Sequence, residues 1–443
     1  MSQPRSLWRR LGTALSTLIG LIAPILLLML APWWLLCTLL LLLAIWLAAT
    51  RIGHQTWSVA QVGILTIPER LGSSLVVVIG IAGVVGVLVA VLAMGAGFEA
   101  TLKQTGTDDT VIVMRAGAQT ELNSVLDHDS ATLVSQLPQV LRNADARPIA
   151  SPELVVVASL PKKSTGLDAN VELRGVGARA WELRPTLKIT AGRKFQPGLR
   201  ELLAGKGARA QFADMELGST IKLNGQSWTV VGAFESGDAY DSEIWGDADI
   251  VGPTYRRGSS TTSVTVRLTD AAAFDAFKAA LASDPRLKVD AKTTRAYYSD
   301  QSAQLSHLIR VLGITVGSIM AIGAVFGALN TMYAAVATRT REIATLRAIG
   351  FRAVPVIVSV LLETMLLALL GGVIGAGLAW SIFNHYTAST LGQNFSQVVF
   401  SFEVSPPLLW AGLKWALAIG FIGGLFPALR AARMPVTAGL REL

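Results

Sequence analysis

Cysteine, histidine and charged residues are scarce in this sequence. The single cysteine, Cys37, excludes an intramolecular disulfide and any metal site built from several cysteines. Only 4 histidines are present and none forms a His-x-x-x-His pair, so a zinc enzyme is disfavoured. Charged residues make up 15% of the 443 residues, whereas about 25% is typical of soluble domains. With 52% hydrophobic residues, the composition argues against a wholly soluble protein.

Long runs without charge show where the hydrophobic residues are concentrated. Residues 11–50, 71–98 and 311–338 contain no charged residue, and residues 353–380 and 408–429 contain one each. A helix of about 28 residues is about 42 Å long, which exceeds the roughly 30 Å hydrocarbon core of a bilayer. These runs therefore predict membrane-spanning helices.

The first run is too long for one span. Pro24 and Pro32 interrupt it, and basic residues lie on both sides, including Arg10 and Arg51. This pattern predicts a transmembrane hairpin of two short helices over residues 11–50, with both ends in the cytoplasm. A single tilted or re-entrant segment is the alternative. A cleaved signal peptide is disfavoured because its apolar core spans only about 7–15 residues.

The distribution of basic residues predicts the orientation in the membrane. Residues 1–10, 51–70, 339–352 and 430–443 together contain twelve Lys and Arg but three acidic residues. Residues 381–407 contain no Lys or Arg. Because cytoplasmic loops are enriched in Lys and Arg, both termini are expected in the cytoplasm. The basic excess of +8 is thus explained by topology, and no nucleic-acid partner is expected.

A large extracytoplasmic domain is predicted at residues 99–307. Short runs rich in β-branched residues begin at Thr110, Leu154, Trp228 and Ser263, and helical stretches are expected at 130–136 and 270–282. Strand, helix and strand near both ends of the segment predict an α+β base. The glycine-rich middle, about 165–260, is expected to form a β-rich insert.

No catalytic constellation is evident in this domain. The segment from Gly198 to Lys206 resembles a phosphate-binding loop, but its glycines are too far apart and Gly207 stands where Ser or Thr is needed. The acidic residues near Tyr240 are interpreted as an exposed turn. An enzyme is therefore disfavoured.

The segment 339–352 between two predicted spans combines four arginines with an apolar helical face. Ile343, Leu346 and Ile349 lie on one side of the expected helix, and Gly350 is expected to end it. Such a helix could lie on the inner leaflet, with its arginines near lipid phosphates. It could instead dock into a groove of another protein and move with it.

The sequence Arg339-Thr-Arg-Glu-Ile-Ala-Thr-Leu-Arg-Ala-Ile-Gly350 resembles the cytoplasmic loop of FtsX-like permeases of the MacB type. The resemblance continues through residues 361–375 and 426–441, and residues 187–195 are similar to a Leu-x-x-Gly-Arg-x-Phe element of that family. One span, a domain of about 200 residues and three further spans also follow the family's order, so the resemblance covers roughly residues 60–443.

The resemblance implies a permease subunit of an ABC transporter in the bacterial inner membrane. Such permeases work as dimers, with a second copy or a paralogue, together with cytosolic ATPase subunits that hold ATP and Mg. The permease itself is expected to bind no cofactor directly. ATP-driven movement of the ATPases is expected to reach the periplasmic domain through long stalk helices, which is termed mechanotransmission. A periplasmic adaptor and membrane lipids are further expected partners.

The chain differs from the family pattern in two places. MacB carries a fused ATPase domain, whereas this sequence contains no Walker motif, so the ATPase is expected on a separate polypeptide. The hairpin at 11–50 is not part of the usual four-span core, and its role is left open.

The resemblance also assigns candidate site residues. ATPase coupling is expected from Arg339, Arg341, Glu342, Ile343, Leu346, Arg347, Ala348 and Gly350. Glu363, an intramembrane charge, is expected near the inner interface, paired with an arginine, and Lys414 is expected to extend toward the outer interface. Three glycine pairs at four-residue spacing permit close helix packing, within the bundle or between two copies: Gly313/Gly317, Gly323/Gly327 and Gly371/Gly375.

The predicted fold is a polytopic α-helical membrane protein with a large α+β periplasmic domain. Its segments are a cytoplasmic N-terminus (1–10), the hairpin (11–50), a cytoplasmic elbow (51–70), span 1 with a stalk (71–98), the periplasmic domain (99–307), span 2 with a stalk (308–338), the coupling helix (339–352), span 3 (353–380), a short periplasmic loop (381–407), span 4 (408–429) and a cytoplasmic C-terminus (430–443). The expected function is efflux or extraction of a substrate from the periplasm or outer leaflet. The alternative is a membrane-anchored periplasmic sensor, or a regulator of cell-wall hydrolases, without transport.

Overall fold

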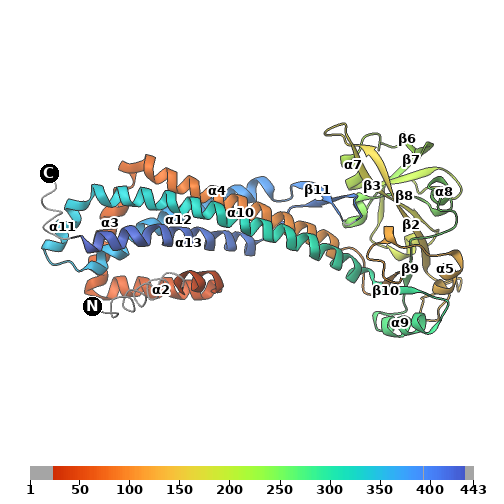
Figure 1. Ribbon diagram of the computed structural model, residues 1–443, viewed down its shortest axis with the longest axis horizontal. Helices are drawn as coiled ribbons and strands as arrows, with labels where there is room; N and C mark the ends of the chain where they lie inside the picture. The colour runs from red at the N-terminus through yellow and green to blue at the C-terminus, as the bar shows by residue number, and fades with distance from the viewer. Residues whose placement is uncertain (1–22, 393, 435–443) are drawn as a thin grey trace, which may run out of the picture. The chain divides into compact units, whose positions relative to one another are not determined.

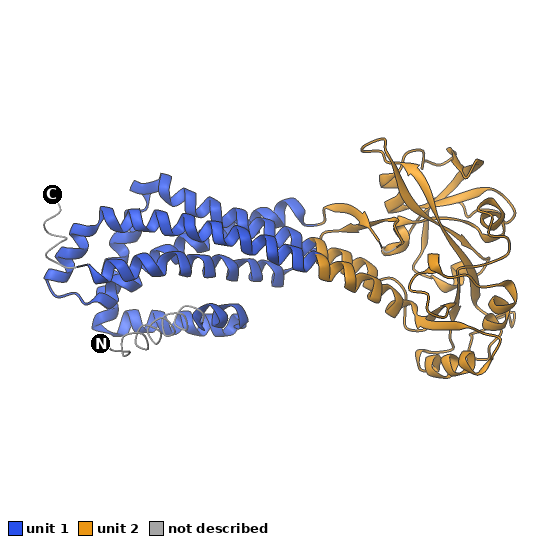
Figure 2. Cartoon of the chain, in the orientation of Figure 1, with its two compact units in different colours: residues 1–93, 309–384, 403–443 blue, residues 94–308, 385–402 orange. Residues whose placement is uncertain are grey.

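The computed structural model describes residues 23–392 and 394–434 of the chain. Two compact units are present (Figure 2). Unit 1 comprises residues 1–93, 309–384 and 403–443, and unit 2 comprises residues 94–308 and 385–402.

Four helices among the described residues are long and apolar enough to cross a membrane (Figure 1). They are α4 (Leu71–Lys103, preceded by the 3₁₀ turn η1, Pro68–Arg70), α10 (Thr294–Thr338), α12 (Ala353–Phe383) and α13 (Pro406–Arg433). Helix α10 begins 14 residues before the predicted start of span 2 at residue 308. Residues 294–307 are mainly polar and include Arg295 and Asp300. The start of span 2 was predicted from the uncharged run 311–338, which these residues do not extend. Helices α4 and α10 are continuous across the boundaries between the two units.

The N-terminal part of unit 1 is helical wherever it is described. Residues 23–30 are helical, the helix breaks at Ala31 and Pro32, and α2 (Trp33–Ala49) follows. Helix α2 then bends by 100° into α3 (Arg51–Leu65). The first half of the predicted hairpin, residues 11–22, lies outside the described residues, so the hairpin stays a prediction.

Lys414 of α13 contacts this N-terminal segment. Its Nζ donates a hydrogen bond to the carbonyl oxygen of Met29, at 2.8 Å. Since proline has no N–H, the break at Pro32 leaves carbonyl groups at the end of the preceding helix without their usual donors. This contact joins residues 23–30 to α13, and the extension of Lys414 toward the outer interface stays a prediction.

Unit 2 is built on one sheet with the strand order β10-β1-β9-β2-β3-β8-β5-β7-β4, and β6 pairs with β7. The strands are β1 (Thr110–Arg115), β2 (Ala150–Pro161), β3 (Asp168–Val176), β4 (Lys188–Gly192), β5 (Glu201–Gly205), β6 (Thr220–Leu223), β7 (Gln226–Glu235), β8 (Ile244–Asp247), β9 (Ser263–Arg267) and β10 (Val289–Thr293). Strand β1 lies between β9 and β10, so the two ends of the domain do meet in one sheet. The middle of the domain continues this sheet through the β2–β3 pair.

Two hydrophobic cores support the sheet of unit 2. One joins β1 and β9 to α5 (His128–Ser135) and α9 (Phe274–Ser283), and includes the fully buried Phe277. Asp270 accepts a hydrogen bond from the backbone N–H of Ala273 and so caps the turn that leads into α9. The other core contains the buried Trp228 and packs strands β2, β3 and β5 to β8 against α7 (Lys206–Gln211) and α8 (Ala248–Thr254). Shorter elements are α6 (Ala180–Leu183) and the 3₁₀ turns η2 (Glu121–Asn123), η3 (Ala239–Ser242) and η4 (Ala271–Ala273).

A second, two-stranded sheet is formed by β11 (Thr387–Leu391) and β12 (Gln397–Ser401). Residues 381–407 are predicted as a short periplasmic loop. The structure forms a β-hairpin there and assigns it to unit 2, although the chain reaches it from α12 and leaves it into α13. Each strand has only five residues, too few for their alternation to stand out beside the long apolar runs.

Candidate functional site

The short helix α11 (Thr340–Ala348) contains most of the residues predicted to contact an ATPase. It ends at Ala348, two residues before Gly350, whose φ of +104° lies in the region that favours glycine. The backbone N–H groups of Gly350 and Phe351 donate to the carbonyl oxygens of Arg347 and Leu346 and close the last turn. Gly350 thus determines where the chain leaves α11 for α12.

The inner face of α11 packs into the helical bundle. Ile343 and Ala344 are 7% and 6% exposed. Ile343 belongs to a hydrophobic cluster with residues of α10, α12 and α13: Met332, Val336, Val356, Val360, Ala428 and Ala431. Burying a side chain of this size contributes about 2 kcal/mol. Ile343 therefore anchors α11 to the bundle.

Arg347 also makes contacts within unit 1. Its Nη1 donates to the carbonyl oxygens of Ala432 and Met434, at 2.9 and 2.7 Å. These carbonyl groups belong to the last turn of α13 and the residue that follows it, where a cation is favourable because the C-terminal end of a helix carries partial negative charge. The structure thus uses Arg347 to tie α11 to α13.

The outer face of α11 remains exposed. It contains the predicted residues Arg341, Glu342, Ala348 and Gly350, together with Thr345. Ile349, immediately after α11, is 71% exposed. Leu346 is intermediate, and it faces the cavity described below. A charged surface with a large exposed aliphatic side chain is suited to a protein partner.

Glu363 of α12 binds two arginines from different parts of the chain. Its carboxylate accepts from Arg70 at 2.9 Å and from Arg339 at 3.1 Å. We call these three residues the arginine–glutamate triad. Glu363 is 5% exposed, so both ion pairs are largely shielded from solvent, and the pairs join α12 to the start of α4 and to the α10–α11 junction.

Helix α3 completes the surroundings of the triad. Arg339 also donates to the carbonyl oxygen of Gly63, at 3.1 Å. A Cβ atom at Gly63 would lie 3.1 Å from Glu363 Oε2 and 3.2 Å from Arg339 Nη1. Glycine is therefore suited to this position because it lets the backbone of α3 approach the ion pairs closely.

A cavity of about 720 Å³ lies between α3, α10, α11 and α12. Its walls are largely apolar, with Val62 of α3, Met332 of α10 and Val360 of α12 among them. Arg339 and Glu363 of the triad also line it. From α11 itself, Arg341, Glu342, Ile343, Thr345 and Leu346 line it, so the cavity reaches the exposed face of α11.

The three glycine pairs have different surroundings. A Cβ atom at Gly313 or Gly317 would lie 2.8 or 2.9 Å from side-chain atoms of α4, and one at Gly371 would lie 2.7 Å from the carbonyl oxygen of Val78. Gly375 is packed against the backbone of α4 in the same way. By contrast, a Cβ atom at Gly323 or Gly327 would meet nothing within 4 Å. Two pairs therefore serve packing within the bundle, and the third faces open space.

Sequence reasoning did not find Arg70 or Gly63. Arg70 is 293 positions from Glu363, so no local pattern connects them. Charge was the signal that could have connected them. Glu363 is the one charged residue in the apolar stretch 353–380, and Arg70 directly precedes the uncharged stretch 71–98. Opposite charges at the ends of two predicted spans could have suggested the pair.

Comparisons with known proteins agree with this architecture. A family model described as the MacB-like periplasmic core domain matches residues 74–284, and one described as the FtsX-like permease C-terminal matches residues 314–436. The macrolide export ATP-binding/permease protein MacB of Neisseria gonorrhoeae is 25% identical over 324 residues, which cover 66% of this chain and 48% of that protein. The protein of the same name from Pectobacterium atrosepticum is 38% identical over 117 residues, or 26% of this chain and 17% of that protein. The chain thus spans about half the length, or less, of these relatives.

Two solved structures that resemble part of this chain are a periplasmic region and an extracellular domain. The periplasmic region of MacB from Actinobacillus actinomycetemcomitans has a TM-score of 0.35 and 17% identity, and covers 44% of this chain and 92% of that chain. The extracellular domain of the noncanonic ABC-type transporter YknZ from Gram-positive bacteria has a TM-score of 0.30 and 16% identity, and covers 38% of this chain and 88% of that chain.

Proposed function

Because the chain belongs to the FtsX-like permeases with a MacB-like periplasmic core domain, it is a permease component of an ABC transporter, and we propose that it transmits movement of a cytosolic ABC ATPase to its periplasmic domain. The observation that carries this proposal is the position of α11. Its outer face is exposed, whereas its inner face and both its ends are bound to other helices of unit 1. A partner that moves α11 must therefore move those helices as well.

The mechanical route that we propose begins with three attachments of α11. Ile343 packs against α10, α12 and α13, Arg347 holds the end of α13, and Arg339 reaches α12 through Glu363. Glu363 in turn holds Arg70, which directly precedes α4. Helices α4 and α10 then continue without interruption into residues of the periplasmic domain, and each acts as a stalk.

The direct contacts with the ATPase are assigned to the exposed residues Arg341, Glu342, Ala348 and Gly350, with Ile349 as an apolar anchor. Arg339, Ile343 and Arg347 are assigned to holding α11 in place. ATP and Mg are held by the ATPase. With the arginine-rich segments in the cytoplasm, the chain is oriented with unit 2 in the periplasm.

We assign a second copy of the permease, or a paralogue, to the face of α4 and α10 that contains Gly323 and Gly327. These glycines and Gly80 line a groove of about 330 Å³. Small residues allow two membrane helices to approach closely, and helix packing in lipid depends on such contacts. The groove is therefore suited to a helix of a partner permease.

The transported substrate is assigned to the periplasm or the outer leaflet. Glu363 is bound by two arginines, and the charge of Lys414 is used in a contact with Met29. Polar side chains that line a substrate route through a membrane are usually exposed to a water-filled path. The arrangement fits efflux or extraction driven from the periplasmic side, with a periplasmic adaptor as a further partner.

The test is to reverse charge or polarity on the outer face of α11. We expect Arg341→Glu and Ile349→Glu to abolish both co-purification of the ATPase and ATP turnover in membranes, because each places a charge that the binding groove does not match. Arg51→Glu, an exposed arginine on the same proposed side of the membrane, is the matched control. Unchanged ATPase binding in both α11 variants would contradict the proposal and favour a sensor or regulator without an ATPase.

A further inference from the structure

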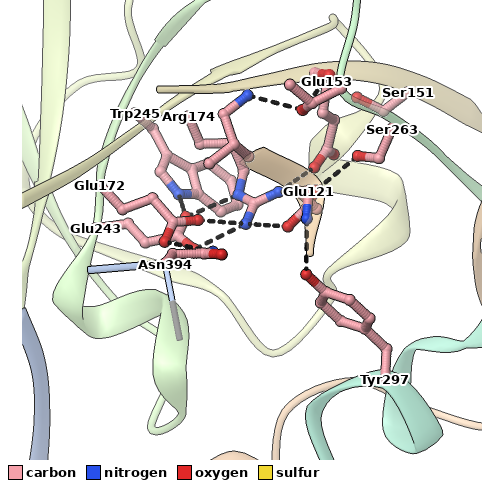
Figure 3. A network of polar contacts seen from close by, with 12 residues as sticks. Glu121, Ser151, Glu153, Glu172, Arg174, Glu243, Trp245, Ser263, Tyr297 and Asn394 are labelled. Carbon is pink, nitrogen blue, oxygen red and sulfur yellow. Dashed lines mark hydrogen bonds and ion pairs between the residues drawn. The ribbon is translucent and has the colours of Figure 1, made fainter. Parts of the chain in front are cut away.

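Unit 2 contains a buried cluster of charges that the proposed function does not use. Arg174 of β3 is 1% exposed and lies between four glutamates (Figure 3). Its guanidinium nitrogens are 2.8 to 3.1 Å from the carboxylate oxygens of Glu121, Glu153, Glu172 and Glu243. Arg184, 8% exposed, binds Glu153 with both terminal nitrogens, at 2.7 and 2.8 Å. We call these six residues the charge cluster.

The charge cluster contains more carboxylates than guanidinium groups. Four glutamates face two arginines, so full ionisation leaves an excess of two negative charges in a buried site. Burial of an unpaired charge is unfavourable, and a carboxyl group in such a site tends to keep its proton. The glutamate with the weakest pairing is expected to take up a proton first, which removes one of these two charges.

Glu172 is the glutamate that keeps a proton most readily. Burial and the nearby carboxylate of Glu243 raise the pKa of Glu172 to about 8, although Arg174 opposes the shift. In contrast, Arg184 and Arg174 hold the pKa of Glu153 below its ordinary value despite its complete burial. Glu172 makes its ion pair with Arg174 at 3.1 Å, the longest in the charge cluster.

Glu172 also contacts the loop between β11 and β12. The Nδ2 of Asn394 and the hydroxyl of Ser396 donate to Glu172 Oε2, at 3.1 and 3.2 Å. Three further hydrogen bonds hold the hairpin: Asn170 donates to the carbonyl oxygen of Phe395, the N–H of Val399 donates to Ser242 Oγ, and Lys162 Nζ donates to Gln397 Oε1. The hairpin thus covers Glu172 and is bound to it directly.

Several elements of unit 2 face Glu172. Leu102 near the end of α4, Tyr297 and Tyr298 near the start of α10, and the hairpin line a cavity of about 30 Å³ beside Glu172. The charged and titratable groups around it are Glu121 of η2, Glu153 of β2, Arg174 of β3, Arg184 after α6, Tyr240 of η3, Glu243 before β8, and Tyr297 and Tyr298 of α10. The hairpin itself contributes no cation, because residues 387–401 contain no Lys, Arg or His.

We propose that Glu172 is a proton-sensitive clasp, which holds the β11–β12 hairpin on the sheet of unit 2 while it is protonated and releases the hairpin when it ionises. The hairpin brings no positive charge to neutralise an ionised Glu172, so water must enter instead, and the hairpin is the element that covers it. Asn394 and Ser396 both have a donor and an acceptor, so they can serve the protonated form.

The direction of the pH effect follows from the two states of the hairpin. Glu172 has a pKa of about 8 with the hairpin docked, and an ordinary value near about 4.3 once water reaches it. A raised pKa stabilises the docked state at low pH, and this stabilisation is lost as the pH rises toward the docked value. Docking should therefore weaken about tenfold per pH unit in the neutral range and level off above about pH 8.

The clasp deepens the proposed function, since it names residues that link the α12–α13 pair to the periplasmic domain. Its test requires no ATP or ATPase. If the proposed function fails, the clasp can still be observed, and if the clasp fails, coupling through α4 and α10 is unaffected.

The experiment is hydrogen exchange with mass spectrometry on the purified full-length chain in lipid nanodiscs, between pH 6 and 9. Protection factors, corrected for the intrinsic pH dependence of exchange, are measured for peptides that cover β12, including the Val399 amide. We expect protection of β12 to fall about tenfold from pH 6 to 7 and to become constant above about pH 8. Constant protection of β12 from pH 6 to 9 would overturn the proposal.

Variants assign the effect to Glu172. Glu172→Gln cannot ionise, so its protection of β12 should change by no more than about twofold across the pH range. Glu216→Gln, at an exposed glutamate, is the matched control and should show the same pH dependence as the wild type. Peptides from β2 and β3 report whether the sheet itself is intact. Ser396→Ala provides a second variant, with less protection of β12 at every pH but the same slope. An unchanged slope in Glu172→Gln with an intact sheet would also overturn the proposal.

Discussion

Glu363 illustrates how one residue can connect three helices. Its carboxylate is buried, and its partners Arg70 and Arg339 approach from separate elements. A buried ion pair adds little net stability compared with apolar packing, but removal of one partner leaves the others buried without compensation. The triad is therefore better explained as a device that fixes relative positions than as a source of stability.

This explanation predicts the effect of neutralising Glu363. Glu363→Gln should lower the free energy of unfolding by about 2 kcal/mol, because two partly buried arginines then lack a carboxylate. The measurement is thermal or denaturant unfolding of the purified chain in detergent. Glu342→Gln, at an exposed glutamate of α11, is the control and should be nearly neutral; equal effects of the two substitutions would argue against a special role for the triad.

The residues of α11 could be predicted only in part. Arg341, Glu342, Ile343 and Arg347 were all predicted to couple to an ATPase. Arg341 and Glu342 lie on the exposed face, whereas Arg347 binds the end of α13 and Ile343 is buried in the bundle. Exposed residues and residues that bind other helices of unit 1 thus alternate within one short motif. Which arginine faces inward depends on where α13 ends, and that is tertiary information that a local pattern does not contain.

Arg347 provides a second prediction at the same scale. Arg347→Ala should cost about 1–2 kcal/mol of stability, since the carbonyl groups of Ala432 and Met434 lose a charged donor near a helix end. Arg352→Ala, at an exposed arginine that precedes α12, is the comparison. Similar stability of Arg347→Ala and the wild type would show that the contacts do not hold α13.

At the scale of elements, long uncharged runs predicted α4, α10, α12 and α13 because a membrane helix requires a continuous apolar stretch. The start of α10 and the β11–β12 hairpin were not predicted. Residues 294–307 are polar on their exposed side, and the two strands of the hairpin are short and depend on contacts with Asn170 and Ser242 of unit 2. Elements whose stability comes from distant partners leave a weak signal in sequence.

The glycine pairs give a prediction that separates packing within one chain from packing between chains. Gly371→Leu should destabilise the bundle, because a Cβ atom there would lie 2.7 Å from the carbonyl oxygen of Val78. Gly327→Leu should leave stability nearly unchanged, since nothing lies within 4 Å, but should weaken association with a second permease. The measurements are thermal unfolding and the oligomeric state in detergent by light scattering.

Two results would contradict this assignment. One is a dimer that forms normally in Gly327→Leu, which would exclude the groove beside α4 and α10 as its interface. The other is an unchanged unfolding temperature in Gly371→Leu, which would mean that α4 and α12 do not approach as closely as their backbones indicate.

At the scale of the whole molecule, the chain combines a unit of candidate membrane helices with an α+β unit, and three connections pass between them along the chain. Two are the continuous helices α4 and α10, and the third is the β11–β12 hairpin between α12 and α13. The triad and Arg347 bind α11 to the helices that lead into all three. Under the proposed function, these attachments are the route by which movement of α11 would reach the periplasmic domain.

The most direct test of this account separates ATP hydrolysis from its effect in the periplasm. The complex of the full-length chain with its ATPase is reconstituted in nanodiscs, and hydrogen exchange in unit 2 is compared with and without ATP, for the wild type and for Glu363→Gln. We predict that the variant still binds the ATPase and hydrolyses ATP, because the outer face of α11 is unchanged, but loses most of the ATP-dependent change in unit 2. An ATP-dependent change in Glu363→Gln equal to that of the wild type would contradict the account.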